Sequence, residues 1–248
     1  MAIELKSTMN GDTAVPVASI YEQTATQKFP LGTEFSTQDG RKFRYAKAGA
    51  VALVNSYMCQ APVEIAHHKE VVIGTAAAIG DTRLTLSTTL STAVTKDQYK
   101  DGYVLVNKGT GLGQCYRIKG NSAGKTCTIE LYDAVAVAIA STAEITLKAN
   151  PWNGVLVAAT TQTGIPVGVP LCPITADYYG WLQVAGPAPV VVDTGDTVVL
   201  GHPVGKPGTN AVAGACGVVD KDGTSNVYGN CMTVGAADET ALVFLTLE

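Results

Sequence analysis

A glycine-rich loop is the first segment of this chain whose residue types could do chemistry. Gly120-Asn-Ser-Ala-Gly124-Lys125-Thr126 ends in the Gly-Lys-Thr with which nucleotide-binding loops hold phosphates. Such loops also need a glycine where this chain has Lys119, and a helix after the threonine whose backbone N–H groups meet the phosphate. Here CTIELY follows, with alternating apolar residues that indicate a strand. The segment is therefore predicted to be a β-hairpin loop.

Two other enzyme patterns are incomplete. The run Gly109-Thr-Gly111-Leu-Gly113 fails the dinucleotide-binding fingerprint, because Gln114 replaces its last glycine and a strand pattern follows. This run is predicted to be a turn. A serine nucleophile on a strained elbow needs Gly-x-Ser-x-Gly, which the chain lacks. The sequence thus indicates no catalytic residues, and we expect a protein that is not an enzyme.

The histidines are candidates for metal ligands or acid–base groups. His67 and His68 are adjacent, so in a strand they would face opposite sides and could not bind one metal ion together. Lys69 and Glu70 beside them favour a solvated connector. His202 lies in Leu-Gly-His-Pro, which predicts a turn. Convergence of the three histidines in space stays open, but their spacing predicts neither a metal site nor a cofactor.

One acidic pair invites comparison with aspartic proteases. Asp193-Thr-Gly-Asp196 contains the Asp-Thr-Gly triplet of those enzymes, which complete their site with a second copy of the triplet. This chain has a single triplet, and Asp and Gly both favour turns. The segment is predicted to be a turn.

Cysteines and tryptophans are also predicted to be structural. Zinc and redox motifs use close cysteine pairs and disulfide scaffolds have denser cysteine, whereas this chain has no Cys-x-x-Cys. Buried free thiols in strands are therefore favoured, and Cys127 would share one strand face with Ile129 and Leu131. Trp152 and Trp181 could form a platform for a sugar ring, but core or interface positions are commoner for aromatic residues in small β-domains. The six cysteines are Cys59, Cys115, Cys127, Cys172, Cys216 and Cys231.

Composition excludes several classes of protein. Charged residues make up 15% of the 248 residues, below the roughly 25% of ordinary soluble domains, so we expect part of the surface to be covered by other copies or by a larger assembly. The net charge of −4 does not favour polyanions, which argues against nucleic acid as a direct partner. No apolar run approaches the ~18 residues of a membrane-spanning helix, and the first residues lack a signal-peptide pattern. We therefore expect no membrane partner and synthesis in a cytoplasm.

Strand patterns dominate after residue 64. Short alternating or apolar runs are separated by Gly, Asp and Pro turns, both in residues 65–150 and in residues 151–248. The turn residues of Asn150-Pro-Trp-Asn-Gly154 predict the boundary between these two domains. Within the second domain, a Leu182/Val184 strand is predicted to end at Gly-Pro-Ala-Pro, before another strand at 190–192. The predicted class is mainly β, with two small β-barrel or β-sandwich domains after an extended N-terminal arm.

Residues 1–64 have a different pattern. The first part is polar with isolated apolar residues, so residues 1 to about 45 are predicted to be an assembly arm that lies against a partner. Within this region 33–36 and 42–45 flank Gln38-Asp-Gly40, a hairpin turn, with the rings of Phe35, Phe43 and Tyr45 on one face. Residues 46–60 are the best candidate for a helix. The residues of the arm expected to bind a partner are Val15, Val17, Ile20, Tyr21 and Phe29.

Three segments carry a resemblance to a known class of proteins. They are LGTEFSTQDGRKFRYAKAGAVAL near the start, KDGYVLVNKGTGLGQCYRIKGNSAG in the middle, and VGVPLCPITADYYGWLQVAGPAPVVVD, which contains the Trp181 strand. Together they resemble capsid decoration, or cement, proteins of tailed bacteriophages.

The resemblance implies a non-enzymatic virion structural protein that binds the outer surface of the phage capsid and stabilises the shell. Its implied partners are the major capsid protein and other copies of itself in a homotrimer, and its implied location is the capsid surface after synthesis in the host cytoplasm. The alternatives are another virion component (a tail, fibre or head–tail protein) or a carbohydrate-binding or hydrolytic β-protein. A fibre should show shaft repeats, which the chain lacks.

Overall fold

The computed structural model describes residues 17–207, 212–219 and 226–248. The predicted mainly-β class is confirmed, since short strands dominate and the described helices are two 3₁₀ turns, η1 (Val17–Tyr21) and η2 (Ala66–His68). Neither turn is long enough to cross a membrane, and the described part of the chain holds no other helix that could.

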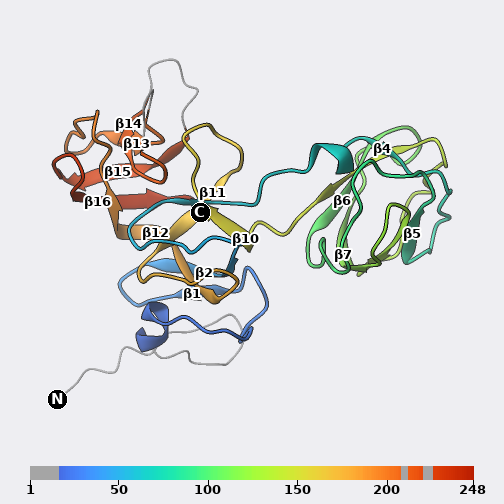
Figure 1. The fold of residues 1–248 in the computed structure, drawn as a ribbon, viewed down its shortest axis with the longest axis horizontal. Coiled ribbons are helices and arrows are strands. Elements are labelled where there is room, and N and C mark those ends of the chain that lie inside the picture. Colours follow the sequence, from blue (N-terminus) through green and yellow to red (C-terminus); the bar gives the residue numbers. More distant parts are fainter. Residues whose placement is uncertain (1–16, 208–211, 220–225) are drawn as a thin grey trace. The chain divides into compact units, whose positions relative to one another are not determined.

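The chain divides into two compact units, and one of them is discontinuous. Unit 1 combines residues 1–62 with residues 151–248, whereas unit 2 comprises residues 63–150 (Figure 1). This arrangement differs from three successive segments with a separate arm, because the early strands pair with late ones. Ten strands form the sheet of unit 1: β1 (Glu34–Ser36), β2 (Lys42–Ala48), β3 (Cys59–Gln60), β10 (Asn153–Val157), β11 (Pro166–Pro170), β12 (Tyr179–Val191), β13 (Pro203–Gly205), β14 (Gly217–Val218), β15 (Val227–Thr233) and β16 (Thr240–Thr246).

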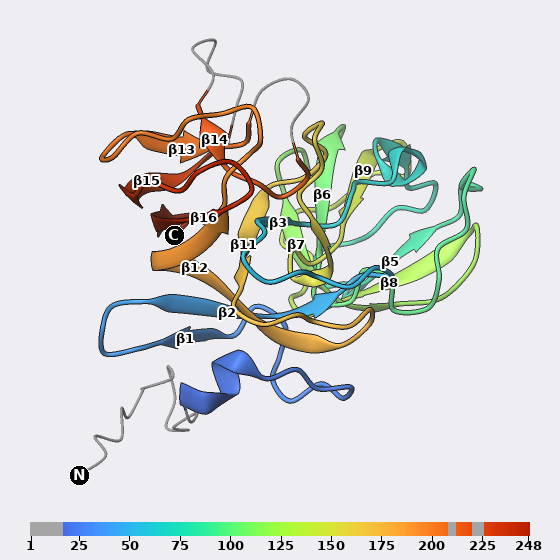
Figure 2. The ribbon, with the colours of Figure 1, turned by 60° about the vertical axis from the view of Figure 1, so that its left-hand side comes forward.

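Unit 1 contains a closed barrel and a curled half-barrel that share β12. The strand order β2-β10-β3-β11-β12 closes into a five-stranded barrel because the first half of β12 also pairs with β2. The second half of β12 pairs with β16, and β15, β13 and β14 continue the half-barrel. In Figure 2, β12 can be followed from its pairing with β2 to its pairing with β16.

Strand β12 is continuous where the sequence predicted a break at Gly-Pro-Ala-Pro. Pro187 pairs with Phe244 and Pro189 with Leu242, so both prolines lie two residues apart in the ladder with β16. A proline has no N–H to donate, and it fits a strand where that position points away from the hydrogen-bonded neighbour. The change of partner occurs at a bulge between Gln183 and Ala185, followed by Gly186 at φ +82°.

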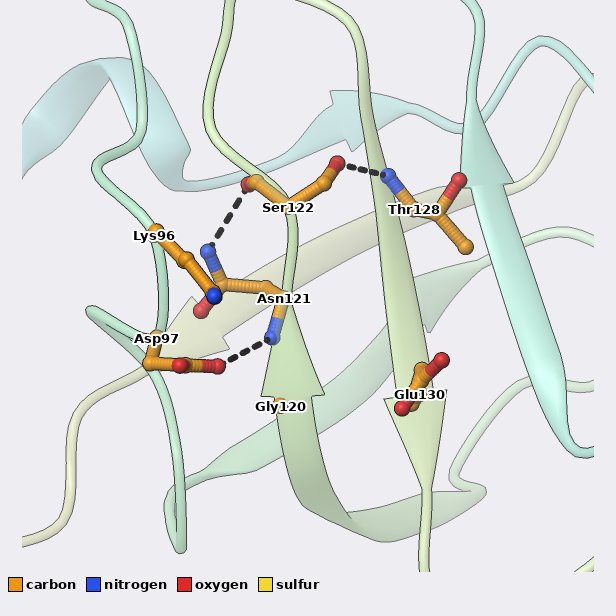
Figure 3. A pocket seen from close by; sticks show the side chains of 7 residues that line it. All are labelled: Lys96, Asp97, Gly120, Asn121, Ser122, Thr128 and Glu130. Atoms are coloured by element: carbon orange, nitrogen blue, oxygen red, sulfur yellow. Dashed lines mark hydrogen bonds between the residues drawn. The ribbon is translucent and has the colours of Figure 1, made fainter.

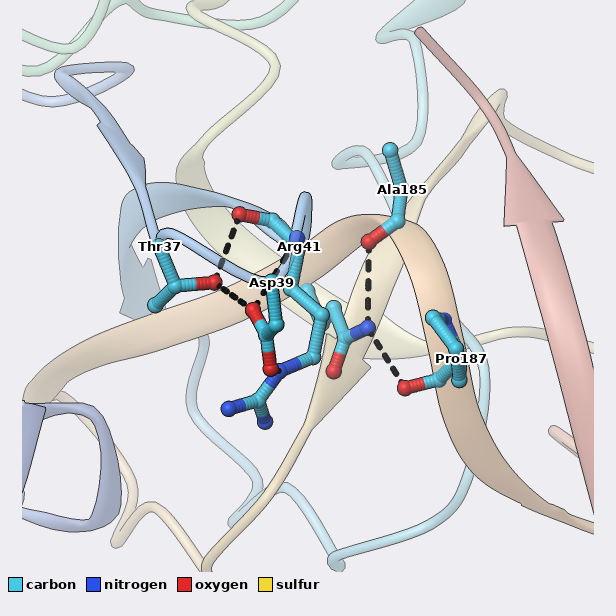
Figure 4. A network of polar contacts seen from close by, with 6 residues as sticks. Thr37, Asp39, Arg41, Ala185 and Pro187 are labelled. Atoms are coloured by element: carbon cyan, nitrogen blue, oxygen red, sulfur yellow. Dashed lines mark hydrogen bonds and ion pairs between the residues drawn. The ribbon is translucent and has the colours of Figure 1, made fainter.

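The side chain of buried Gln183 binds backbone carbonyl groups of β12 at the point where the strand changes its partner. Its Nε2 donates hydrogen bonds to the carbonyl oxygens of Ala185 at 3.0 Å and of Pro187 at 2.9 Å (Figure 4). Figure 4 also shows the β1–β2 turn, where the Thr37 hydroxyl bonds Asp39 and the Arg41 Nε lies 2.8 Å from the Asp39 carboxylate. This turn confirms the predicted hairpin.

The segment at 46–60 is not a helix. Ala46 and Ala48 are buried in β2 and face the barrel core, and a Cβ on Gly49 would lie 2.9 Å from Leu156 Cδ2. Small residues here let β2 approach β10 closely, so strand pairing overrides the helix propensity of alanine.

Unit 2 is a six-stranded antiparallel sheet in the order β4-β9-β6-β7-β8-β5. An antiparallel bridge between Gly74 and Leu86, with Ser87 N–H donating to the Ile73 carbonyl at 3.0 Å, joins the two edges. Its core is mainly aliphatic, with Ile73, Leu84 and Ile129 fully buried beside the rings of Tyr99 and Tyr116. The strands are β4 (Val71–Val72), β5 (Arg83–Leu86), β6 (Tyr103–Lys108), β7 (Cys115–Asn121), β8 (Cys127–Leu131) and β9 (Glu144–Lys148).

The chain leaves and re-enters unit 1 through neighbouring strands. Gln60 in β3 pairs with Leu156 in β10, and Cys59 pairs with Val157, in antiparallel register. In the sequence, unit 2 is therefore inserted between β3 and β10, in place of the turn that would connect them in a simple hairpin. The two ends of unit 2 also meet, since Lys148 Nζ lies 3.9 Å from a Glu64 carboxylate oxygen.

Candidate functional site

The loop from Gly120 to Thr126 is a hairpin loop, as predicted. It joins β7 to β8, which pair antiparallel, and the segment after Thr126 is a strand. Its backbone N–H groups therefore do not begin a helix. The Gly109–Gly113 run is likewise a turn, between β6 and β7, with all three glycines at positive φ.

The histidine pair is not the solvated connector that the sequence predicted. Residue His68 is 1% exposed, because the η2 turn directs it inward. Its Nδ1 lies 2.6 Å from the Tyr99 hydroxyl and its Nε2 lies 2.9 Å from the Thr92 carbonyl oxygen, which accepts. Exposed His67 bonds the Thr92 hydroxyl at 2.8 Å. His68 is thus a satisfied core residue, and among the described residues no group of three or more His, Cys, Asp or Glu could hold a metal ion.

The Asp193–Asp196 segment is a turn, and Asp193 connects it by a hydrogen bond to the segment that contains Val212. Asp193 is 3% exposed and accepts hydrogen bonds from the N–H groups of Gly195 (3.1 Å) and Val212 (2.5 Å). Asp196 Oδ2 is buried and accepts no hydrogen bond from the described residues. Burial, and then the neighbouring Asp193 carboxylate, raise the pKa of Asp196 above its usual value of 3.8.

Replacing Asp196 with asparagine is expected to raise the free energy of unfolding near neutral pH by less than about 1 kcal/mol. The folded state holds the Asp196 proton more strongly than the unfolded chain does, so ionisation costs stability above the usual carboxyl pKa. That cost disappears as the pH falls toward this value. The gain from asparagine should therefore shrink on acidification, which urea unfolding of both proteins across this range measures; a gain that grows would contradict the assignment.

Four of the six cysteines are buried free thiols, as predicted: Cys59, Cys127, Cys216 and Cys231. Burial raises the pKa of the Cys216 thiol to about 12. Cys172 is half-buried and Cys115 is exposed on β7, so these two differ from the prediction.

The residues predicted to bind a partner through the arm have different environments. Val15 lies outside the described residues, and Val17 begins η1. Ile20 is fully buried, and the Phe29 ring lies 5.5 Å from that of Trp181. Both pack on β2 and β12 of the same chain, so residues 20–45 are not an extended arm. Tyr21, at 54% exposure, is the described member of the set that faces outward.

The strands of the half-barrel are without charged residues. Strands β12, β13, β14, β15 and β16 contain no Asp, Glu, Lys or Arg. Pro187, Phe244, Asn230 and Pro203 lie opposite one another across four of these strands, and Phe244 is 46% exposed. We call this surface the half-barrel face; its outward residues include Pro187, Pro189, Pro203, Asn230, Met232, Leu242 and Phe244.

Unit 2 presents a different surface, with a polar pocket of about 230 Å³. Figure 3 shows Lys96 and Asp97 on one loop, Asn121 and Ser122 at the end of β7, and two further lining residues on β8. Asn121 is 4% exposed and fixes the pocket wall, because its Nδ2 donates to the Thr95 carbonyl at 2.8 Å and its Oδ1 accepts from the Tyr99 N–H at 2.8 Å. The pocket is lined by Lys96, Asp97, Gly120, Asn121, Ser122, Thr128 and Glu130.

A row of aromatic and charged side chains lies beside this pocket. Tyr103 pairs with Arg117 across β6 and β7, and the Tyr132 N–H donates to the Arg117 carbonyl oxygen at 3.0 Å. The Arg117 guanidinium lies 4.7 Å from the Tyr132 ring centroid, and the Asp101 carboxylate binds both side chains at 2.9 Å. We call Tyr103, Arg117, Tyr132 and Asp101 the tyrosine row. No sequence motif indicated it, because Tyr103 and Arg117 come from two strands, Tyr132 directly follows β8, and Asp101 lies in a turn.

Trp181 is 2% exposed and lies in the core with Phe35 and Tyr45, as predicted; Trp152 is half-buried beneath Arg44. Neither is therefore an open sugar platform. Comparisons of the chain with protein families, with curated proteins and with solved structures found no match.

Proposed function

We propose that this protein is a non-enzymatic structural component of a tailed-phage virion, which binds the outer surface of the capsid and stabilises the shell. The resemblance of three segments to capsid decoration proteins supports this proposal, and the charge-free half-barrel face is the observation that carries it. The partners are the major capsid protein and further copies of this chain, without nucleic acid or membrane.

The half-barrel face is suited to contact with protein rather than with water. Exposed protein surfaces usually intersperse charges of both signs, and this chain does so on unit 2, where Arg83 lies 2.9 Å from Glu130 and Lys108 lies 2.8 Å from Glu144. The half-barrel strands have no such pairs among the described residues. A neutral face that includes Phe244, Leu242 and Met232 loses little by desolvation and gains by burial.

Self-association of this chain through the half-barrel face would explain why the strands of that face lack charged residues. A surface without charge meets no like-charge repulsion when it approaches another copy of itself. Closed cyclic symmetry would bury the patches without open-ended assembly, and the resemblance gives three as the number of copies. A trimer presents three capsid-binding surfaces at once, which raises the strength of binding to a shell whose own symmetry matches.

Replacing Phe244 with glutamate is expected to weaken self-association at least about 100-fold, because it would bury an unpaired carboxylate in an apolar contact. The side chain is 46% exposed in the single chain, so the variant should fold. Light scattering measures the oligomeric state. Ile79→Glu, at a 70% exposed position on unit 2, is the matched control and should leave the oligomer intact.

The test of function is sedimentation with phage heads that lack the protein. The native chain should sediment with these heads and raise their resistance to heat, and Phe244→Glu should bind them more weakly than Ile79→Glu does. Association of the native chain should survive high salt, because screening weakens ion pairs and not apolar contacts. Failure to bind heads would overturn the capsid role, and sedimentation with purified tails alone would assign the protein to the tail.

A further inference from the structure

We propose that unit 2 binds an uncharged carbohydrate along the outward face of β7 and β8, with one sugar ring in the polar pocket and another against the tyrosine row. This inference is independent of the capsid role, because it concerns residues 96–132 of unit 2 alone.

The pocket and the tyrosine row belong to one continuous surface. Thr128 and Glu130 line the pocket, and Tyr132 follows two residues later, directly after the end of β8 at Leu131, where its N–H still donates to the Arg117 carbonyl oxygen of β7. Because alternate residues of a strand share one face, these three side chains form a line, and Thr128 lies roughly 13 Å from Tyr132 along the strand. That length suits a short oligosaccharide rather than a single small molecule.

The pocket offers the hydrogen-bonding groups that sugar hydroxyls need. Lys96 donates, the carboxylates of Asp97 and Glu130 accept, and the hydroxyls of Ser122 and Thr128 do both. Its volume of about 230 Å³ is below the roughly 300–1,000 Å³ of sites for drug-sized ligands, which suits one ring. The lining contains no large apolar side chain, so it is a poor receptor for an apolar anchor of a peptide.

The geometry of the pocket is fixed before a ligand arrives. Asp97 adopts φ +56° and its Oδ1 accepts from the Asn121 N–H at 3.4 Å, and Glu130 is held 2.9 Å from Arg83. The Ser122 hydroxyl accepts from the Thr128 N–H at 2.9 Å, which fixes the opening of the hairpin loop. Fixed side chains lose little conformational entropy on binding, which favours weak polar ligands such as sugars.

The tyrosine row supplies the apolar side of the site. Tyr103 is 42% exposed and Tyr132 is 46% exposed, on either side of Arg117. Aromatic rings offer flat apolar surface together with a hydroxyl, which matches the mixed character of a pyranose ring. The guanidinium stays over Tyr132 because Asp101 binds both groups.

The charges of the site give no net attraction for an anionic ligand. The pocket lining and the tyrosine row together hold three carboxylates (Asp97, Asp101 and Glu130) against the two cations Lys96 and Arg117, so phosphates or uronic acids meet a slightly negative surface. Both arginines near the site are paired with these acids, Arg83 with Glu130 and Arg117 with Asp101, each at 2.9 Å. An anionic group that binds either arginine would have to compete with its carboxylate partner, whereas a neutral glycan can accept from the remaining N–H groups without breaking these pairs.

The full-length protein is tested by calorimetric titration with cellotriose, maltotriose and chitotriose, and with heparin and a single-stranded DNA oligonucleotide as anionic probes. At least one neutral trisaccharide should bind with a dissociation constant in the millimolar range or below, and the anionic probes should not. Tyr132→Ala should weaken that binding at least about 10-fold, equivalent to about 1.4 kcal/mol. Tyr132→Phe keeps the ring but loses the hydroxyl bond to Asp101, so it should weaken binding less than Tyr132→Ala does.

The control is Tyr178→Ala, which removes an exposed tyrosine on unit 1 and should not change sugar binding. In NMR spectra of the bound protein, amide shifts should concentrate at residues 96–97 and 117–132. The inference is overturned if no neutral trisaccharide binds, if Tyr132→Ala binds as the native chain does, or if heparin or DNA binds more tightly than every sugar. None of these results depends on capsids, so failure here leaves the proposed function standing.

Discussion

Replacing Trp181 with alanine is expected to lower the free energy of unfolding of unit 1 by about 3–5 kcal/mol. The indole is 2% exposed and sits among aromatic rings, with centroid distances of 5.1 Å to Tyr45, 5.4 Å to Phe35 and 5.5 Å to Phe29. These rings come from β2, β1 and the segment before β1, so the cavity would loosen the contact that holds the start of the chain on β12. Calorimetry measures the loss as a lower transition temperature.

The matched control for this change is unit 2. All strand pairings of β4 to β9 lie within residues 63–150, so unit 2 should unfold at an unchanged temperature in the Trp181→Ala chain. Hydrogen exchange of the Ile118 and Ile129 amides reports on unit 2 separately. Equal loss of protection in both units would show that they unfold as one body, contrary to this expectation.

Replacing Gly102 with alanine is expected to destabilise unit 2 by more than about 3 kcal/mol, a large effect for a single methyl group. A Cβ at this position would lie 2.2 Å from the Lys148 carbonyl oxygen and 3.0 Å from the Tyr99 carbonyl oxygen. Those are backbone atoms of packed segments, and the Gly102 carbonyl itself accepts from the Ile118 N–H at 2.8 Å. Relief would require separation of β6 from β9, which urea unfolding followed by circular dichroism would detect.

Gly113→Ala separates crowding from backbone strain. Gly113 adopts φ +83° but has nothing within 4 Å of a Cβ, so alanine there should cost only about 1 kcal/mol. If Gly102→Ala lowers the free energy of unfolding no more than Gly113→Ala does, the close contacts around Gly102 are not the reason that a glycine is needed there. Unit 1 should be unaffected by either change.

Much of the local structure follows from the sequence because it depends on neighbouring residues. The turn at Gln38–Gly40 was predictable from its Asp-Gly pair, and Gly40 adopts φ +85° as such a turn requires. Alternation in CTIEL placed Cys127, Ile129 and Leu131 inward, and all three are buried. The hairpin loop at 120–126 was predictable because a strand pattern follows it.

The wrong predictions concern segments whose structure depends on contacts with residues far away in the sequence. Ala46 and Ala48 have helix propensity, but β2 pairs with β10 and β12, more than 100 residues away in the sequence. Ile20 and Phe29 resemble isolated anchors in a polar segment until Trp181 is placed beside them. Pro187 and Pro189 predict a break in the strand when only the sequence is known. A proline lacks an N–H group, and this loss disturbs pairing only with the strand that the N–H would face, so the ladder with β16 had to be known.

The candidate surfaces were predictable only in part. The low content of charge was visible, but its absence from the strands of the half-barrel face required the sheet topology. Trp152 and Trp181 were considered for sugar stacking, whereas the rings proposed to contact a sugar are the exposed Tyr103 and Tyr132. Their relation to Arg117 depends on register between strands, which no spacing along the chain reveals.

The insertion of unit 2 between β3 and β10 has a consequence for the order of folding. During synthesis β1 to β3 appear before their partners β10 to β12, and pairing Cys59 with Val157 must close a loop of 98 residues (157 − 59). For a disordered loop of that length the entropic cost is roughly 4 kcal/mol. Folding of unit 2 brings Glu64 to Lys148 and joins the two ends beforehand, so the barrel then closes a short gap. We therefore expect unit 2 to fold before β3 pairs with β10, so that the inserted unit lowers the entropic cost of closing the barrel.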